Sequence, residues 1–168
     1  MVGIGEFRGF ICDEMLGKLT RWLRMIGYDT LYPRGKTDRD LSELSVSEKR
    51  VLLTRDRDLA CMRDPLTFFI KEEKVAGQIG EMVELLKSGR VPRGTTRCPM
   101  CNGVLSAVQR CNADEFIEEI PDRVKEKAEV FYTCGGCGKV YWEGTHTDSI
   151  KKILNRYDME LILPKPPS

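Results

Sequence analysis

The sequence lacks two features that would each point to a class of protein. No stretch approaches the roughly 18 consecutive apolar residues of a membrane-spanning helix, so we expect no such helix. There is also almost no charge excess, because 27 Lys and Arg face 26 Asp and Glu. The net charge of +1 gives no overall attraction to nucleic acid or to an anionic membrane, so any charge-driven binding must be local.

Residues 1–9 contain no apolar run followed by a small-residue cleavage site, and they carry Glu6 and Arg8. We therefore expect no secretory signal, and a cytoplasmic protein. The 168 residues are 41% hydrophobic and 32% charged, which is the composition of an ordinary globular protein. This length suffices for one domain of average size or for two small ones.

Residues 10–86 alternate between short apolar runs and amphipathic segments, the pattern of an α/β fold with a parallel sheet flanked by helices. The apolar periodicity is clearest in the segment that ends at Gly27. Thr37 or Asp38 is expected to cap the next helix. The predicted strands are 10–12, 28–32, 51–54 and 66–70, and the predicted helices are 15–26, 38–44 and 79–86.

Residues 87–97 combine four basic residues with Gly and Pro and contain no acid, which is typical of an exposed connection. We therefore predict an α/β domain at 1–90, a linker at 91–97 and a small second domain at 98–168. The second domain is expected to end in an amphipathic helix through Ile150 and Tyr157.

Four of the seven cysteines form two CxxC pairs, which predict one zinc ion bound by Cys98, Cys101, Cys134 and Cys137. Four thiolates would leave no open position for water, so we expect a structural ion. The pairs are separated by more than the roughly 15–20 residues of common ribbons. An insertion at about 112–128 must therefore loop out of the predicted zinc ribbon. A redox CxxC or two disulfides is the alternative.

Two acidic residues, Asp13 and Asp56, follow predicted strands, where parallel sheets gather their ligands. If these strands are neighbours, the two carboxylates converge, and Asp38 or Asp58 could join them. Such a cluster suits Mg²⁺ or Mn²⁺, which would activate water for phosphodiester hydrolysis. Each Asp also precedes a helix, so a helix N-cap is the plain alternative.

One face of the first predicted helix is basic, because Lys18, Arg21 and Arg24 lie opposite its apolar residues. These side chains could hold a nucleic-acid backbone through phosphate contacts. A merely solvated face is the alternative. In the second half, Tyr141 and Trp142 could stack on bases, although strand alternation puts them on opposite faces and assigns at least one to the core.

Four segments closely resemble the Mut7-C family: 10–29 (FICDEMLGKLTRWLRMIGYD), 50–56 (RVLLTRD), 98–102 (CPMCN) and 137–146 (CGKVYWEGTH). The resemblance covers nearly the whole chain. It implies a PIN-like ribonuclease domain fused to a zinc ribbon, and therefore RNA as the partner.

Carried over by position, the resemblance implies that Asp13 and Asp56 bind Mg²⁺ or Mn²⁺. It also implies that Asp38 completes the set, with Asp40 as the alternative, and that Asp58 is the fourth acid. Arg55 and His146 join the candidate RNA contacts. A non-catalytic zinc-ribbon protein that binds nucleic acid or ribosomes remains the competing hypothesis.

Overall fold

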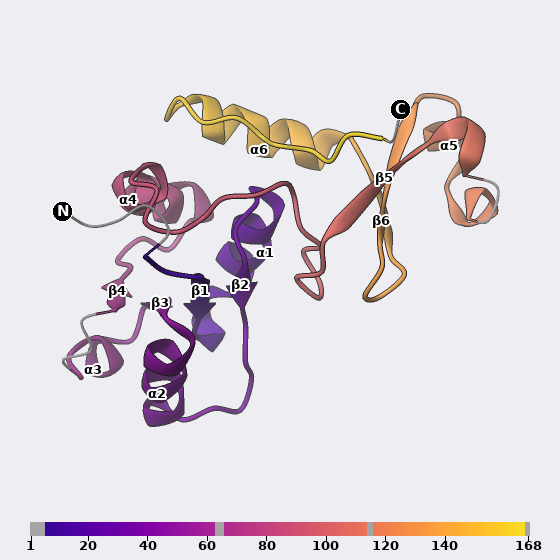
Figure 1. The fold of residues 1–168 in the computed structure, drawn as a ribbon. Coiled ribbons are helices and arrows are strands. Elements are labelled where there is room, and N and C mark those ends of the chain that lie inside the picture. The colour runs from indigo at the N-terminus through magenta and orange to yellow at the C-terminus, as the bar shows by residue number, and fades with distance from the viewer. Residues whose placement is uncertain (1–5, 63–65, 114–115, 167–168) are drawn as a thin grey trace.

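The chain folds around two β-sheets, which a computed structural model describes over residues 6–62, 66–113 and 116–166 (Figure 1). The first sheet is parallel and four-stranded, and the second has three strands. All four strands predicted for the first sheet are present, although β2 is shorter than expected. In spatial order they are β2 (Thr30–Leu31), β1 (Gly9–Cys12), β3 (Arg50–Thr54) and β4 (Thr67–Phe69).

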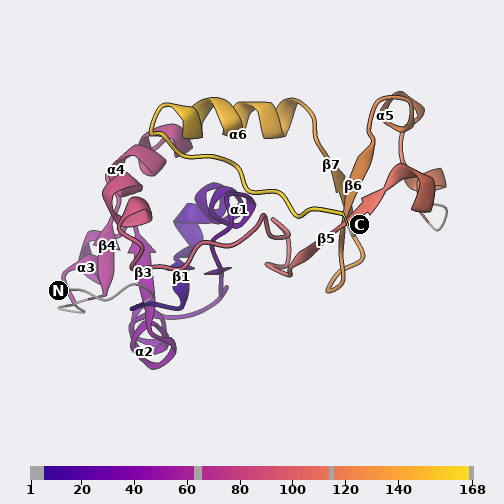
Figure 2. The same cartoon turned by 45° about the horizontal axis from the view of Figure 1, so that its top comes forward.

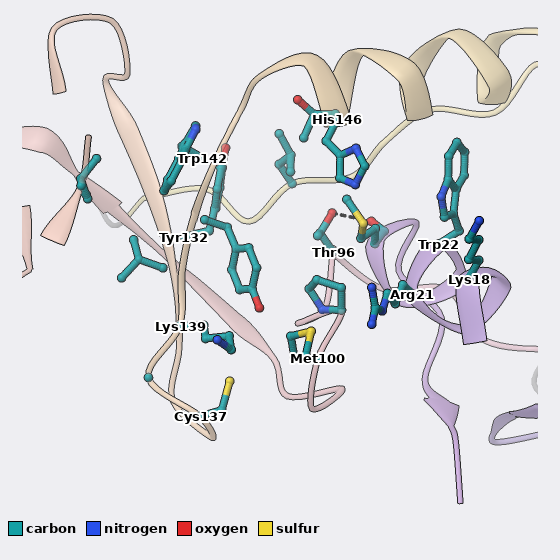
Figure 3. Close-up of a pocket in the computed structure, with 18 residues that line it drawn as sticks. Lys18, Arg21, Trp22, Thr96, Met100, Tyr132, Cys137, Lys139, Trp142 and His146 are labelled. Carbon is teal, nitrogen blue, oxygen red and sulfur yellow. Dashed lines mark hydrogen bonds between the residues drawn. The ribbon is translucent and has the colours of Figure 1, made fainter. Parts of the chain in front are cut away.

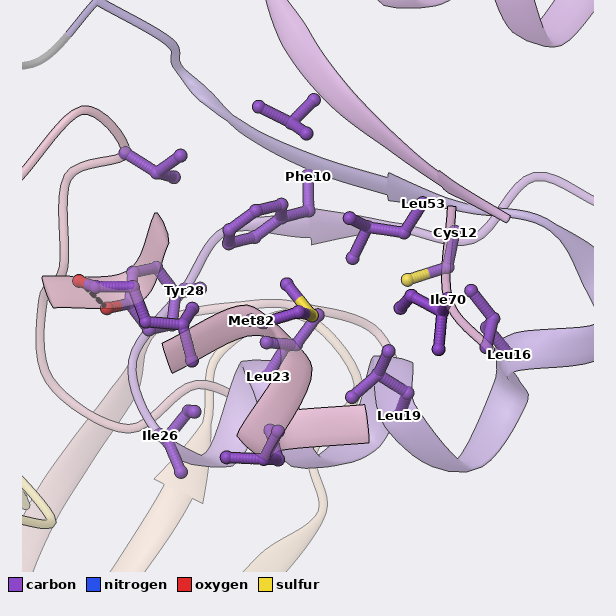
Figure 4. Packing of buried hydrophobic residues seen from close by; sticks show 14 of the residues in the cluster. Phe10, Cys12, Leu16, Leu19, Leu23, Ile26, Tyr28, Leu53, Ile70 and Met82 are labelled. Carbon is purple, nitrogen blue, oxygen red and sulfur yellow. Dashed lines mark hydrogen bonds between the residues drawn. The ribbon is translucent and has the colours of Figure 1, made fainter. Parts of the chain in front are cut away.

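Helices cover both faces of the parallel sheet because successive residues of a strand point to opposite sides. Phe10 and Cys12 of β1 belong to the larger core cluster, whereas Ile11 belongs to a smaller one on the other face. Figure 4 shows part of the larger cluster. Its face is covered by α1 (Gly17–Met25), α4 (Val75–Lys87) and α6 (Thr145–Asn155), and the opposite face by α2 (Asp38–Glu48) and α3 (Arg57–Ala60).

The first helical segment begins and ends at residues whose chemistry fixes its limits. Asp13 accepts a hydrogen bond from Met15 N–H and so caps a short 3₁₀ helix, Glu14–Leu16, that leads into α1. Gly27 ends the segment at φ 101°, a left-handed conformation that favours glycine. A Cβ there would also overlap the carbonyl of Gly94.

The second sheet is antiparallel and has the order β5-β6-β7. Between β5 and β6 lies the predicted insertion, which contains the short helix α5 (Asp122–Lys125) and a small core around Ile120 and Phe131. The strands are β5 (Leu105–Gln109), β6 (Val130–Cys134) and β7 (Val140–Trp142).

Helix α6 extends from the second sheet back towards α4 (Figure 2). Its buried residues Ile150 and Leu154 belong to the same core cluster as Phe10 of the parallel sheet. Val91 and Thr96 are also buried, so the segment that precedes the second sheet is packed along part of its length. In the described part of the chain, no helix has both the length and the apolar character needed to cross a membrane.

Candidate active site and metal centre

The four predicted zinc ligands come together in the structure. The Sγ atoms of Cys98, Cys101, Cys134 and Cys137 all lie within 4.8 Å of one another. Two of the separations are 3.6 Å, for Cys98 and Cys137, and 3.4 Å, for Cys101 and Cys134. Tetrahedral zinc with bonds of about 2.3 Å would place its sulfur atoms about 3.8 Å apart. The donor set therefore fits zinc, which would stabilise the ribbon when bound.

The two halves of this centre have the same local geometry. Asn102 N–H donates to the carbonyl of Cys98 at 2.9 Å, and Gly138 N–H donates to the carbonyl of Cys134 at 2.8 Å. Asn102 and Gly138 both have positive φ, 69° and 71°. Each CxxC is thus a tight turn that closes one residue after its second cysteine and points both thiols to one place.

The surroundings of Cys98 favour its thiolate form. Burial by itself would raise the pKa of Cys98, but hydrogen bonds from Tyr141 Oη and from the backbone of Cys101 and Met100 outweigh it and lower the pKa to about 7. A thiolate is the form that binds zinc. Tyr141 therefore supports the metal centre through its hydrogen bond to a ligand sulfur. Burial beside this thiolate raises the pKa of the Tyr141 hydroxyl.

The first CxxC turn is anchored to the parallel sheet. Arg24 is buried, and its guanidinium donates to the carbonyls of Pro99 and Met100, both at 2.9 Å, and to that of Thr30, also at 2.9 Å. The side-chain oxygen of Asn102 accepts from Thr30 N–H at 3.1 Å. The metal centre and the edge strand β2 are therefore joined by direct hydrogen bonds.

A partly buried ion pair extends this contact. Asn102 also donates to Asp29 at 2.7 Å, and Arg50 contacts both carboxylate oxygens of Asp29 at 3.0 and 3.1 Å. Burial acts to raise the pKa of Asp29, but these hydrogen bonds outweigh it and hold the pKa below its ordinary value. Sequence reasoning missed this network, because Asp29, Arg50 and Asn102 lie far apart in the chain and match no local pattern.

The predicted catalytic residue Asp13 is buried at the carboxyl end of β1. One carboxylate oxygen accepts from Met15 N–H at 2.9 Å. The other accepts from the hydroxyl of Thr54 and from Arg55 N–H, the latter at 3.1 Å. The carboxylate is thus fixed in orientation by three donors and keeps acceptor capacity on the first oxygen.

Asp56 follows β3 and is exposed. Its Oδ1 accepts from the N–H groups of Asp58 and Leu59 at 2.7 and 3.3 Å, and so caps α3. Its own N–H donates to the hydroxyl of Thr54 at 2.9 Å. Thr54 therefore bridges Asp13 and Asp56, and both residues combine the cap role with a place at the candidate site.

The topology explains why these two acids lie together. Strands β1 and β3 are hydrogen-bonded neighbours, with Cys12 paired to Leu53. Helix α1, after β1, covers one face of the sheet, and α3, after β3, covers the other. Asp13 and Asp56 therefore lie at the switch point, where the helices that follow neighbouring strands cover opposite faces of the sheet. Open parallel sheets form ligand crevices at this point.

The other predicted acids are placed differently. Asp38 is the exposed first residue of α2, after the cap Thr37, and Asp58 is exposed in α3. Asp40 completes a capping box with Thr37, whose hydrogen bonds hold the pKa of Asp40 below its usual value. Metal ions are commonly bound by His, Cys, Asp and Glu. Among the described residues, the four cysteines are the one group of three or more of these side chains close enough to share an ion. Asp13 and Asp56 thus follow neighbouring strands, and no third acid in the described part of the chain lies close enough to share an ion with both.

The basic residues predicted to contact RNA divide into two sets. Lys18 and Arg21 are exposed on α1, and His146 is exposed in the first turn of α6. Arg24 turns inward instead and is committed to the metal-centre turn. Arg55 lies next to the Asp13 carboxylate through its backbone, and its guanidinium lies 3.5 Å from Glu73.

A cavity of about 920 Å³ lies between α1 and the second sheet (Figure 3). Lys18 and Arg21 border it from α1, and His146 borders it from α6. Tyr141 packs with the zinc-side core and Trp142 packs with the core of the insertion. The predicted placement of these two rings on opposite faces of the strand is therefore confirmed.

Fold and site together define a class: an α/β protein with an acid after each of two neighbouring strands of its parallel sheet, and four cysteines placed to bind a metal ion beside an antiparallel sheet. Residues 8–154 match the Mut7-C RNAse domain family, and the chain belongs to that family. No curated protein and no solved structure shows a significant match to the chain.

Proposed function

We propose that the chain is a PIN-like, metal-dependent ribonuclease that hydrolyses phosphodiester bonds of cytoplasmic RNA. The observation that carries this proposal is the juxtaposition of Asp13 and Asp56 at the ends of neighbouring strands, linked through Thr54. Membership of an RNAse domain family supports the reaction class.

The donor set suits a hard divalent ion. Mg²⁺ is commonly held by one or two carboxylates together with waters and substrate phosphate. Asp13 retains acceptor capacity on the oxygen that faces Met15, and the second oxygen of Asp56 accepts no hydrogen bond from the described part of the chain. When bound, Mg²⁺ or Mn²⁺ would orient water and offset the charge that develops on phosphate.

The chain's own residues prepare this site. Thr54 and Arg55 N–H fix the Asp13 carboxylate, so little reorganisation is needed when an ion and RNA arrive. We assign Asp38 and Asp58 as further acids that act through water or on substrate arrival. In this proposal the zinc ribbon is structural and also holds the RNA.

The proposal is tested by cleavage of labelled RNA in the presence of Mn²⁺. Asp13→Asn and Asp56→Asn should each lower the cleavage rate by roughly 100-fold or more, because each removes a charged ligand of the ion. Asp122→Asn, an exposed change on α5, is the matched control and should cleave like the parent. Cleavage by Asp13→Asn at the parent's rate would refute the assignment.

One observation favours a second candidate, a non-catalytic nucleic-acid- or ribosome-binding protein. Both acids already serve as helix caps, so their positions have a structural explanation without an ion. A ligand stabilises only the state it binds. A rise in melting temperature with Mn²⁺ that disappears in Asp13→Asn supports the ribonuclease, and the absence of any rise supports the binding protein.

A further inference from the structure

The cavity between α1 and the ribbon is built from segments that lie far apart in the sequence. In Figure 3, Lys18, Arg21 and Trp22 reach it from α1, Tyr132 from β6 and His146 from α6. The first CxxC turn forms part of the boundary through Met100. Because α1 and the CxxC turn are tied together by Arg24, the two sides of the cavity hold a fixed separation.

The charge of this cavity differs from that of the whole chain. Lys18, Arg21 and Lys139 line it together with His146, and none of its described lining residues is Asp or Glu. The chain as a whole has 26 acids against 27 Lys and Arg. Apart from Cys137, a thiolate ligand when zinc is bound, the charged groups of the lining are therefore basic, which suits a polyanion.

Aromatic side chains accompany these charges. Trp22 is half-buried and His146 is exposed, so both rings are open to a base in the cavity. Tyr132 borders the far side but is only 5% exposed. Basic side chains that follow a phosphate backbone, combined with rings on which bases stack, are the recognition mode of single-stranded nucleic acid.

The size and position of the cavity favour unpaired RNA over an RNA duplex. At about 920 Å³ it is as large as pockets that enclose small molecules, and it opens between α1 and the second sheet rather than along a flat face. In an A-form duplex the bases are paired and stacked, so their faces are unavailable to protein rings. We propose that this cleft, between α1 and the zinc ribbon, binds an unpaired stretch of RNA with bases on its rings and phosphates on Lys18 and Arg21.

Helix α1 connects this cleft to the candidate active site. Asp13 caps the segment that becomes α1, and Arg21 lies two turns further along it. At 1.5 Å per residue these two positions are about 12 Å apart along the axis, a span that a short piece of RNA covers. The inference rests on the proposed ribonuclease function, and it limits the substrate to RNA that is single-stranded next to the cut.

Binding is measured by fluorescence anisotropy with a fluorescein-labelled oligouridylate and no added Mg²⁺ or Mn²⁺, so the result does not depend on catalysis. The Lys18→Ala/Arg21→Ala double variant should bind more weakly, and the slope of log affinity against log salt should fall by about 1.4, or about 0.7 for each lost phosphate contact. Trp22→Leu should weaken binding roughly 5- to 100-fold and leave that slope unchanged.

Two controls separate binding in the cleft from general effects of charge and of folding. Arg123→Ala/Lys127→Ala removes the same charge from exposed positions in and beside α5, outside the cleft, and should bind like the parent. Trp22 also contacts the core, so its variant is checked by melting temperature, and the exposed His146→Ala supplies a ring deletion that spares the fold. Equal loss in the cleft and control variants would overturn the proposal.

The strand preference has its own test. An RNA duplex of the same length should bind the parent at least about tenfold more weakly than the oligouridylate, and equal affinity would overturn the single-strand assignment. Failure of the parent to bind the oligouridylate would also overturn the proposal that the cleft binds unpaired RNA. Metal-dependent cleavage of another RNA by the same sample would then leave the proposed ribonuclease function standing, so the two failures are distinguishable.

Discussion

At the scale of single residues, Arg24 has a different role in the structure from the one that its sequence pattern predicts. Its place in the helical pattern puts it beside Lys18 and Arg21 on a basic face. In the structure it is 7% exposed and donates to three carbonyls, two of them in the first CxxC turn. Burial lowers the pKa of its guanidinium, but the hydrogen bonds keep the charge satisfied.

Arg24→Met should therefore lower the free energy of unfolding by about 3 kcal/mol, because it leaves buried carbonyls without donors. Arg21→Met, one turn earlier on the exposed side of α1, is the matched control and should change stability by no more than about 0.5 kcal/mol. Urea denaturation of both variants provides the measurement. Equal stability of the two would mean that Arg24 does not anchor the turn.

At the scale of secondary-structure elements, local patterns predicted most of the fold. The strands at residues 10–12 and 51–54 and the helix that ends at Gly27 depend on apolar periodicity and on end signals, both of which are local. The neighbouring position of β1 and β3 is not local. The predicted acidic site required β1 and β3 to be neighbours, and the observed pairing of these strands meets that requirement.

The candidate site was predictable to a similar extent. The two CxxC pairs identify the four cysteines from the sequence, although the interval between the pairs is longer than in common ribbons. The bridge made by Thr54 and the anchoring of Asn102 depend on contacts between segments far apart in sequence. The cavity beside α1 depends on several such segments at once, so no single stretch of sequence indicates it.

Helix α6 illustrates an element whose own sequence gives its type but not its partner. Leu154 is 1% exposed and packs in the core of the parallel sheet. Leu154→Ala should lower the free energy of unfolding by about 2–5 kcal/mol, the usual cost of such a cavity. Lys152→Ala, exposed on the same helix, should have little effect. Thermal denaturation distinguishes them, and a small effect of Leu154→Ala would contradict this packing.

At the scale of the whole molecule, the metal centre and the parallel sheet form a coupled unit. Thr30 N–H of β2 donates to Asn102, the residue that closes the first CxxC turn. Loss of zinc would release this turn, because four thiolates no longer hold it. A metal that lies outside the candidate active site would thus control the order of the sheet edge next to it.

Zinc removal by a chelator should therefore speed amide hydrogen exchange at Thr30 by about tenfold or more, the factor that corresponds to about one hydrogen bond. Leu52 N–H, which donates to Leu66 at the other side of the sheet, is the control and should remain protected. Added zinc should restore protection at Thr30. Unchanged exchange at Thr30 would show that the sheet edge does not depend on the metal.

The position of α6 in the core also has a consequence for biosynthesis. Met159 lies in the same buried cluster as Phe7, so Phe7 meets its final neighbours only after the roughly 150 residues that follow it have been translated. A nascent chain that has made the parallel sheet but not α6 exposes apolar surface while it waits on the ribosome. Full folding of the parallel-sheet half is thereby deferred until α6 and Met159 have been synthesised.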